Sequence, residues 1–174
     1  PISVNLAHDI DLLRHFCGEI ETVQAQAVDS IRGFQNEDVA GALLKFRDGA
    51  IGTISVSDSI VSPWSWEMTS KENPIYPSTQ ESCYLIGGSH GSLSIPDLNL
   101  WSHKSERDWW EPLSSSTKDF KPADPLYKQI NHFLNVIRKE EKPIVSGREG
   151  LLTLRVIEAI QKSALTQKSV QVEV

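Results

Sequence analysis

Residues 39–57, VAGALLKFRDGAIGTISVS, contain two apolar runs that meet at a short polar turn. Asp48-Gly49 lies between the runs, and an Asp-Gly pair in this position favours a β-hairpin because glycine readily adopts the positive φ of a tight turn. The sequence therefore predicts two antiparallel strands, Val39–Phe46 and Ala50–Ser57. This hairpin makes an antiparallel sheet the centre of the predicted fold.

Alternation along the second of these strands predicts that the sheet has one covered face and one open face. Small apolar residues occupy one side of the strand, whereas the other side carries mainly hydroxyl groups. The two sets are Ala50, Gly52, Ile54 and Val56, and Ile51, Thr53, Ser55 and Ser57. We expect helices to cover the first face and the second to stay free of helices.

Further strands are predicted on both sides of the hairpin. Val23–Ala27 alternates apolar and Gln side chains, as in a half-buried strand. Ser82–Ile86 and Ser92–Ile95 flank a glycine-rich turn, and a short strand is expected at Leu98–His103. Alternating valines predict a closing strand at Val170–Val174.

Three helices complete the pattern. Asn5–Phe16 repeats apolar residues at helical spacing and ends before Gly18. A second helix starts after Asp124, where an N-cap residue precedes a proline. A third starts at Ser146, whose spacing to Glu149 matches a capping box, and continues to about Thr166.

The last two helices are each expected to bury one apolar stripe. The stripes are Leu126, Ile130, Phe133, Leu134 and Ile137 in the second helix, and Leu151, Leu154, Ile157 and Ile160 in the third. The order of elements predicts an α+β fold, an open and predominantly antiparallel β-sheet with helices packed on one face. The length of 174 residues predicts a single domain.

The composition excludes several classes of function. The chain carries 17 Lys and Arg against 23 Asp and Glu, a formal net charge of −6. Nucleic-acid-binding surfaces need clustered basic side chains, so nucleic acid is not expected as a partner. No apolar run approaches the roughly 20 residues of a membrane-spanning helix. The sparse cysteines, Cys17 and Cys83, favour reduced thiols, so we expect a cytoplasmic protein.

The only dense glycine cluster, Gly87–Gly91, does not match a nucleotide-binding loop. The G-x-G-x-x-G spacing is absent, and the cluster precedes a predicted strand rather than a helix whose N-terminus would hold a pyrophosphate. We interpret it as a hairpin turn. The sequence predicts no cofactor-binding residues of its own and no dedicated metal site.

His8 and Asp11 are the candidate catalytic residues. They lie three positions apart on a predicted helix, so the carboxylate can fix the tautomer of the imidazole and raise its basicity. A histidine held in this way suits proton transfer near neutral pH. Two alternatives remain open: a helix start whose polar residues simply face solvent, and a metal site formed by His8, Asp11 and His15.

Candidate substrate contacts come from the long segment between the two predicted hairpins. Val61–Gln80 is rich in Ser, Pro and aromatic residues, and connections of this length are often functional. Trp66 and Glu67 combine a stacking surface with a carboxylate, a pair suited to a sugar-like ligand. The alternative is that the tryptophan covers the core.

The chain resembles the C-terminal domain of the glucose-fructose oxidoreductase/inositol dehydrogenase/rhizopine-catabolism (Gfo/Idh/MocA) family. The resemblance includes the family's His-x-x-Asp helix, two hairpins and the motifs of the last two helices, all in the same order. The matching segments are Leu6–Leu13 with Cys17–Glu19, Glu37–Ala40 with Phe46–Gly52, Ile86–Leu93, Gln129–Phe133, Pro143–Gly150 and Val156–Ile160.

The resemblance implies the substrate-binding and oligomerisation half, residues 1–174, of a two-domain enzyme. An N-terminal Rossmann domain outside this sequence would bind NAD or NADP, and the substrate would be a sugar, a polyol or a related hydroxy compound. His8 would contact the reacting hydroxyl, with a lysine from the other domain completing the site. Asp11 would hold His8. Independently of the resemblance, an uncovered sheet face can be self-complementary around a twofold axis, so we expect the hydroxylated face to join subunits into a homodimer or homotetramer.

Two motif positions depart from the family. The family usually places an Asp four residues before the His and a Gly two before it, where this sequence has Val4 and Leu6. Asn5 is the nearest polar residue, and its amide can orient a hydroxyl but cannot accept a proton as a carboxylate does. Either His8 acts with the distant lysine alone, or the chemistry differs; a non-catalytic sugar-binding or oligomerisation module is the alternative function.

Overall fold

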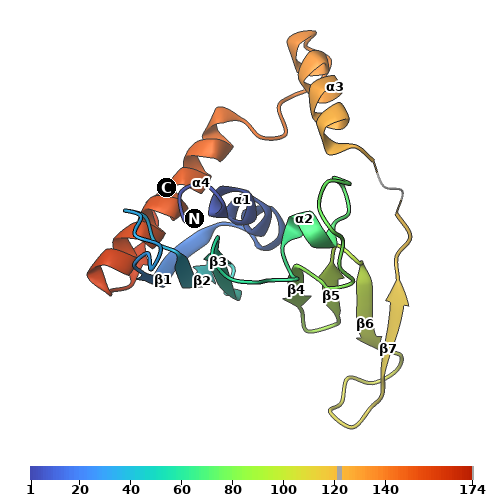
Figure 1. The fold of residues 1–174 in the computed structure, drawn as a ribbon. Helices are drawn as coiled ribbons and strands as arrows, with labels where there is room; N and C mark the ends of the chain where they lie inside the picture. Colours follow the sequence, from blue (N-terminus) through green and yellow to red (C-terminus); the bar gives the residue numbers. More distant parts are fainter. Residues whose placement is uncertain (121–122, 174) are drawn as a thin grey trace. The chain divides into compact units, whose positions relative to one another are not determined.

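The computed structural model describes residues 1–120 and 123–173. The chain divides into two compact units (Figure 1). Unit 1 comprises Pro1–Ile60 and Pro143–Val174, and unit 2 comprises Val61–Lys142. Unit 1 is therefore built from two separate segments of the sequence, and unit 2 is inserted between them.

Unit 1 contains a four-stranded antiparallel sheet. Its strands are β1 (Ile20–Val28), β2 (Val39–Phe46), β3 (Ile51–Ser57) and β8 (Val170–Gln171), in the order β3-β2-β1-β8. The predicted hairpin is confirmed, because β2 and β3 pair antiparallel with Leu43 opposite Thr53. Gly49 adopts a φ of 92°, a conformation that explains the glycine at this turn.

The closing strand is shorter than predicted. β8 pairs with β1 through two residues, and the Val172 amide extends the pairing by donating to the Glu21 carbonyl at 2.9 Å. Val174, predicted as the end of this strand, lies outside the described residues. The last strand of the chain thus lies beside the first.

Two helices of unit 1, α1 (Leu6–Cys17) and α4 (Gly147–Thr166), cover one face of its sheet (Figure 1). α4 packs on β1, and α1 packs on α4. Ile10, Leu44 and Ile160 are fully buried where these elements meet. Gly18 ends α1 with a φ of 84°, as its position predicts.

The opposite face of this sheet is not covered by a helix of unit 1. The residues of this face form four rows across β1, β2 and β3, and in one row Gln24 lies beside Leu43 and Leu43 beside Thr53. The twelve paired positions are Thr22, Gln24, Gln26 and Val28 of β1, Val39, Gly41, Leu43 and Lys45 of β2, and Ile51, Thr53, Ser55 and Ser57 of β3. Ile51, Thr53 and Ser55 of β3 point outward, as the alternation predicts. The prediction of an open sheet with helices packed on one face is confirmed here.

Unit 2 contains a second four-stranded antiparallel sheet. Its strands are β4 (Tyr84–Gly87), β5 (Ser92–Ile95), β6 (Asn99–His103) and β7 (Leu113–Thr117), in sequential order. The α+β class is confirmed, with the strands distributed over two sheets. β7 was not predicted, because the sequence Leu-Ser-Ser-Ser-Thr has no apolar alternation to distinguish it from a loop.

Two helices belong to unit 2. The short α2 (Trp66–Thr69) lies within the segment expected to be a loop, and α3 (Pro125–Ile137) starts where Asp124 predicts. Asp124 caps α3 by accepting hydrogen bonds from the amides of Leu126 and Tyr127. The predicted start of α3 and its cap are therefore correct.

The predicted buried stripes are wrong in α3 and partly wrong in α4. α3 buries none of its residues, so its apolar side chains are largely exposed. In α4, Ile157 and Ile160 are buried as predicted, but Leu151 and Leu154 are exposed. Thr153 and Ser163 lie on the buried face because hydrogen bonds satisfy their hydroxyls there.

Candidate functional site

Two of the predicted site residues, Asn5 and His8, lie at the N-terminal end of α1. Both are exposed. Asn5 is the N-cap residue, yet its side chain makes no capping hydrogen bond. Since residues three positions apart share one side of a helix, the Asn5 amide and the His8 imidazole face the same region. The structure therefore offers a hydrogen-bonding group and a proton acceptor together at the surface of unit 1.

Asp11, predicted to hold His8, contacts a different side chain. Its Oδ1 accepts a hydrogen bond from Thr153 Oγ1 at 3.2 Å and lies 3.8 Å from Arg14 Nη1. This bond points toward α4 rather than toward His8. The orienting role of Asp11 toward His8 stays a prediction.

Arg14 is the most extensively bonded side chain near these residues, and it is only 6% exposed. Its Nε and Nη2 donate to the two carboxylate oxygens of Glu19 at 3.0 and 2.8 Å. Nη2 also donates to the Glu149 carboxylate at 2.8 Å, and Nη1 donates to the Glu149 carbonyl at 3.0 Å and to Thr153 Oγ1 at 2.9 Å. Arg14 thus ties the C-terminal part of α1 to the N-terminal part of α4.

The charges in this cluster stabilise one another. The hydrogen bond from Arg14 lowers the pKa of Glu19 below its usual value, even though partial burial opposes that shift. The bond to Glu19 in turn raises the pKa of Arg14. Both groups are therefore charged at neutral pH, as a paired and partly buried ion pair requires.

Only one of the two hydrogen bonds of the capping box predicted for α4 forms. Ser146 Oγ accepts from the Glu149 amide at 3.3 Å, as predicted. The Glu149 carboxylate, however, binds Arg14 instead of the Ser146 amide. A charged guanidinium is a stronger partner for a carboxylate than a backbone amide is, which explains the difference.

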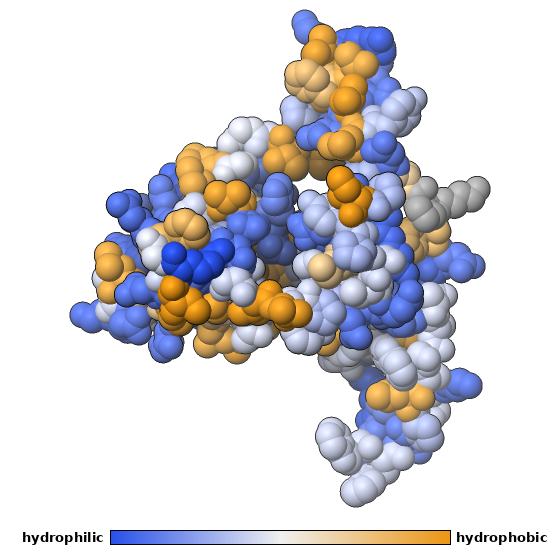
Figure 2. All heavy atoms as spheres, in the orientation of Figure 1, coloured by the Kyte–Doolittle hydropathy of each residue, from blue (hydrophilic) through white to orange (hydrophobic). Residues whose placement is uncertain are grey.

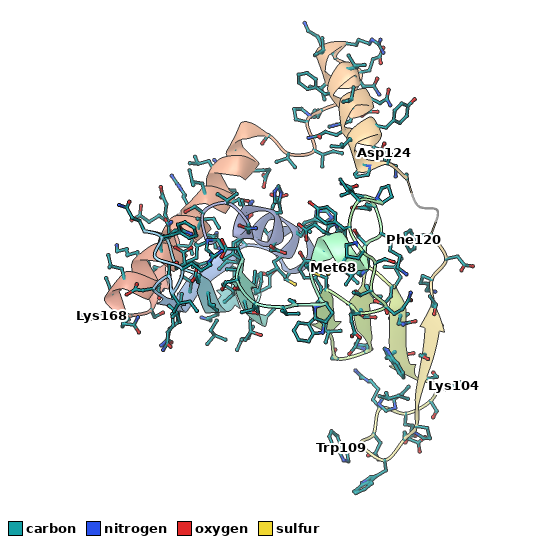
Figure 3. All side chains as sticks on the ribbon, in the orientation of Figure 1. Met68, Lys104, Trp109, Phe120, Asp124 and Lys168 are labelled. Atoms are coloured by element: carbon teal, nitrogen blue, oxygen red, sulfur yellow. The ribbon has the colours of Figure 1, made fainter. Side chains whose placement is uncertain are left out.

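The predicted substrate contacts, Trp66 and Glu67, begin α2 in unit 2, the helix that also carries Met68 (Figure 3). The Trp66 indole Nε1 donates to Glu72 at 3.0 Å, and its ring lies 5.9 Å from that of Tyr84. Glu67 is exposed. Trp66 is thus partly engaged in packing, and a substrate role for both residues stays a prediction.

The glycine cluster forms the turn between β4 and β5. Its Gly88 amide donates to the Gly91 carbonyl at 2.8 Å, and the turn leads directly into the strand β5 rather than into a helix. The turn therefore lacks the helix N-terminus with which proteins bind a pyrophosphate. Within residues 1–120 and 123–173, no three His, Cys, Asp or Glu side chains lie close enough to bind a metal ion.

A shallow depression of unit 1 lies on its open sheet face. It measures about 180 Å³ and is lined mainly by Thr22, Gln24, Leu43, Lys45 and Ile51. It is separate from Asn5 and His8, because α1 contributes nothing to its lining.

No described helix is long and apolar enough to be a transmembrane span.

Sequence reasoning missed the role of Arg14. One signal was available, because Leu6, Ile10 and Arg14 follow one another at intervals of four and place a charge in the buried row of α1. A charge in such a row needs a partner. The partners Glu149 and Thr153, however, lie far away in the sequence and carry no local signal.

Comparison with known proteins identifies relatives over nearly the whole chain. The family model GFO_IDH_MocA_C, described as oxidoreductase family, C-terminal alpha/beta domain, matches residues 1–172. Myo-inositol 2-dehydrogenase of Thermotoga maritima is 25% identical over 174 residues, which are 95% of this chain and 47% of that protein.

Solved structures share the fold. The WlbA dehydrogenase from Bordetella pertussis, in complex with NADH and UDP-GlcNAcA, aligns with a TM-score of 0.63 and 24% identity over 98% of this chain and 44% of its own. Levoglucosan dehydrogenase, in complex with NADH and levoglucosan, aligns with a TM-score of 0.70 and 17% identity over 99% of this chain and 50% of its own. The chain spans about half the length of these relatives.

Proposed function

Because the chain belongs to the Gfo/Idh/MocA oxidoreductase family as its C-terminal alpha/beta domain, we propose that it is the substrate-binding half of an NAD(P)-dependent dehydrogenase. The observation that carries the proposal is the exposed His8 at the start of α1, within a family match that covers residues 1–172. The relatives are about twice as long, and two of them are described with NADH. In this proposal a Rossmann domain outside residues 1–174 binds NAD or NADP.

The proposed reaction oxidises a secondary alcohol. When bound by the Rossmann domain, a nicotinamide would supply the acceptor for the hydride of the carbinol C–H bond. The O–H proton passes to the neutral imidazole of His8, and the C–O single bond becomes a carbonyl. Asn5 orients the hydroxyl through its amide, and a lysine of the Rossmann domain completes the site. A positioned general base of this kind typically contributes about 10²–10⁴ to the rate.

The proposed substrate is a sugar, a polyol or a related hydroxy compound. The relatives support this class, since one is a myo-inositol dehydrogenase and another is described with levoglucosan. Trp66 and Glu67 are proposed to contact the substrate, the indole by stacking on the ring and the carboxylate by accepting hydroxyl hydrogen bonds.

The open face of the unit 1 sheet is proposed to join subunits into a homodimer or homotetramer. It combines Gln, Thr, Ser, Leu, Ile and Val side chains with Gly41 in the middle of one row. Lys45 is the only charged residue among the twelve paired positions of this face, and it forms an ion pair with Glu21 at 2.8 Å. A face with few charges is compatible with self-association around a twofold axis, since it brings few like charges together.

A non-catalytic sugar-binding or oligomerisation module is the second candidate. One observation favours it: Val4 occupies the position where the family usually has an Asp, and its side chain is exposed beside Asn5. A valine neither binds nor releases a proton. Such a module would bind its ligand but turn nothing over.

The test compares two histidine variants in the full-length polypeptide. NADH or NADPH formation is measured with myo-inositol, levoglucosan and a panel of other sugars and polyols. His15→Ala is the matched control, because His15 is also exposed on α1 but lies two turns from His8. We expect His8→Ala to lower kcat by about 10²–10⁴, and His15→Ala to leave it unchanged. Substrate binding without turnover in the wild type would favour the module.

A further inference from the structure

Thr153 connects buried Arg14 to Asp11 through a directional pair of hydrogen bonds. Arg14 Nη1 donates to Thr153 Oγ1 at 2.9 Å, and Thr153 Oγ1 lies 3.2 Å from Asp11 Oδ1. A guanidinium can only donate, so the hydroxyl must accept from Arg14 and give its single proton to Asp11. The direction of both bonds is therefore determined by chemistry.

The Arg14 guanidinium, which begins this series of hydrogen bonds, uses all of its donors. Its five hydrogen bonds, to Glu19 twice, to Glu149 twice and to Thr153, match the five N–H donors of arginine. The Glu19 contact is bidentate, which constrains the plane of the group as well as its position. A saturated, buried guanidinium gives the Thr153 hydroxyl a rigid donor.

This series of hydrogen-bonded residues runs from the interior of unit 1 toward the exposed N-terminal end of α1. His8, Asp11 and Arg14 follow at intervals of three along one oblique row of the helix, and their exposure falls from the exposed His8 through the partly exposed Asp11 to the buried Arg14. Among the described residues, no hydrogen bond occupies Oδ2 of Asp11. One oxygen of this carboxylate is thus fixed, and the other is available one turn from His8.

We propose that Thr153 and Arg14 are positioning residues for His8 and act through Asp11. The inference rests on the proposed function, in which His8 becomes an imidazolium when it takes the hydroxyl proton. A carboxylate with one oxygen held by Thr153 keeps its second oxygen and its negative charge near that imidazolium. Loss of the Thr153 hydroxyl frees the carboxylate to rotate, so the charge no longer has one position relative to His8.

The first experiment compares Thr153→Val with Thr153→Ser in the full-length dehydrogenase. Valine has the same shape but no hydroxyl, whereas serine keeps the hydroxyl. We expect the valine variant to lower kcat about tenfold with KM little changed, because the lost interaction acts in the transition state. The serine variant, which keeps the hydroxyl, should have nearly the kcat of the wild type. Thr166→Val, which removes an exposed α4 hydroxyl that donates to the Lys162 carbonyl, is the matched control.

The second experiment needs no turnover and so separates this inference from the proposed function. The side-chain NMR signals of the chain's five histidines are compared at one pH between wild type, T153V and T153S. We expect the His8 imidazole signals to move in T153V, to return in T153S, and the His132 signals in unit 2 to stay unchanged.

The two experiments have distinct outcomes. A wild-type protein that oxidises nothing would overturn the proposed function, while a His8 shift confined to T153V would still support the coupling. An unmoved His8 signal in T153V, with the fold intact by thermal unfolding, would overturn the inference. A loss of kcat that serine does not restore would also overturn it, since packing rather than the hydroxyl would then be responsible.

Discussion

α3 and α4 start in the same way but differ in what they bury. Each has a side-chain cap, Asp124 for α3 and Ser146 for α4, and each is amphipathic. α4 buries seven residues against the rest of unit 1, whereas α3 buries none, and Figure 2 shows apolar side chains on the surface of α3. Caps and periodicity thus determine where a helix forms, but whether its apolar side is buried depends on a partner elsewhere.

The largest expected difference between the helices comes from their apolar side chains. Ile160 of α4 is 0% exposed and Ile130 of α3 is 61% exposed. Ile160→Ala should lower the free energy of unfolding by about 2–5 kcal/mol, because it leaves a cavity in the core. Ile130→Ala should change it by less than about 0.5 kcal/mol. Urea unfolding measures both, and similar losses would mean that α3 is covered by a partner in solution.

The next effect concerns a hydroxyl that serves two backbone groups. Ser163 of α4 is fully buried, accepts from the Ala25 amide at 2.8 Å and donates to the Lys168 carbonyl at 2.6 Å. Ser163→Ala should cost about 1–3 kcal/mol, because both groups would stay buried without a partner.

The control for that variant lies on α3. Asn131 donates to the Tyr127 carbonyl at 2.9 Å, but this bond is exposed. Water replaces it in Asn131→Ala, so the free energy of unfolding should hardly change. If the two variants cost the same in chemical denaturation, burial would not be the property that separates the helices.

The caps provide a comparison at equal chemistry. Ser146→Ala and Asp124→Ala each remove a capping acceptor, which typically costs about 1 kcal/mol. In α4 the loss should lower the unfolding midpoint of unit 1, because α4 packs on β1. In α3 it should appear as lower helical content by circular dichroism at an unchanged midpoint, since a 13-residue helix without packing is marginal. A lower midpoint in both variants would contradict this distinction.

The smallest expected effect is a pH dependence at the junction of α1 and α4. Arg14 lowers the pKa of Glu19 in the folded state, so the unfolded chain takes up a proton first as the pH falls. Stability should therefore decrease below the ordinary Glu pKa of about 4.3. The contribution should stay under about 1 kcal/mol because Glu19 is partly exposed. Measuring the free energy of unfolding at a series of acidic pH values tests this expectation. Glu19→Gln should remove this part of the dependence of the unfolding free energy on pH.

Local signals predicted most of the fold. The Asp-Gly turn, Gly18 and the caps Asp124 and Ser146 act within a few residues, so their elements form where the sequence indicates. The prediction that α3 buries its apolar stripe was wrong, because apolar spacing shows only that one side of a helix can be buried. The strand β7 was not predicted, because its run of serines shows no alternation of apolar and polar residues.

The candidate site was predictable only in part. His8 was predicted from its motif, and Asn5 was predicted as the polar residue nearest to the position where the motif's Asp is missing. Both lie exposed at the start of α1, and their roles stay predictions. The buried contacts beneath them were not found, since Arg14 meets Glu149 and Thr153 across 135 and 139 positions of sequence. Pairings over such separations depend on how α4 packs, and no local pattern encodes that.

The division of unit 1 into two segments has a consequence for protein synthesis. The strands β1, β2 and β3 leave the ribosome early, but α4 and β8, which cover and extend their sheet, are translated only after the whole of unit 2. At about 5–20 residues per second, the apolar face of that sheet waits for several seconds in a nascent chain. During this interval the face is a binding surface for chaperones and a risk for aggregation. The last helix, rather than the first hairpin, therefore decides when unit 1 is folded.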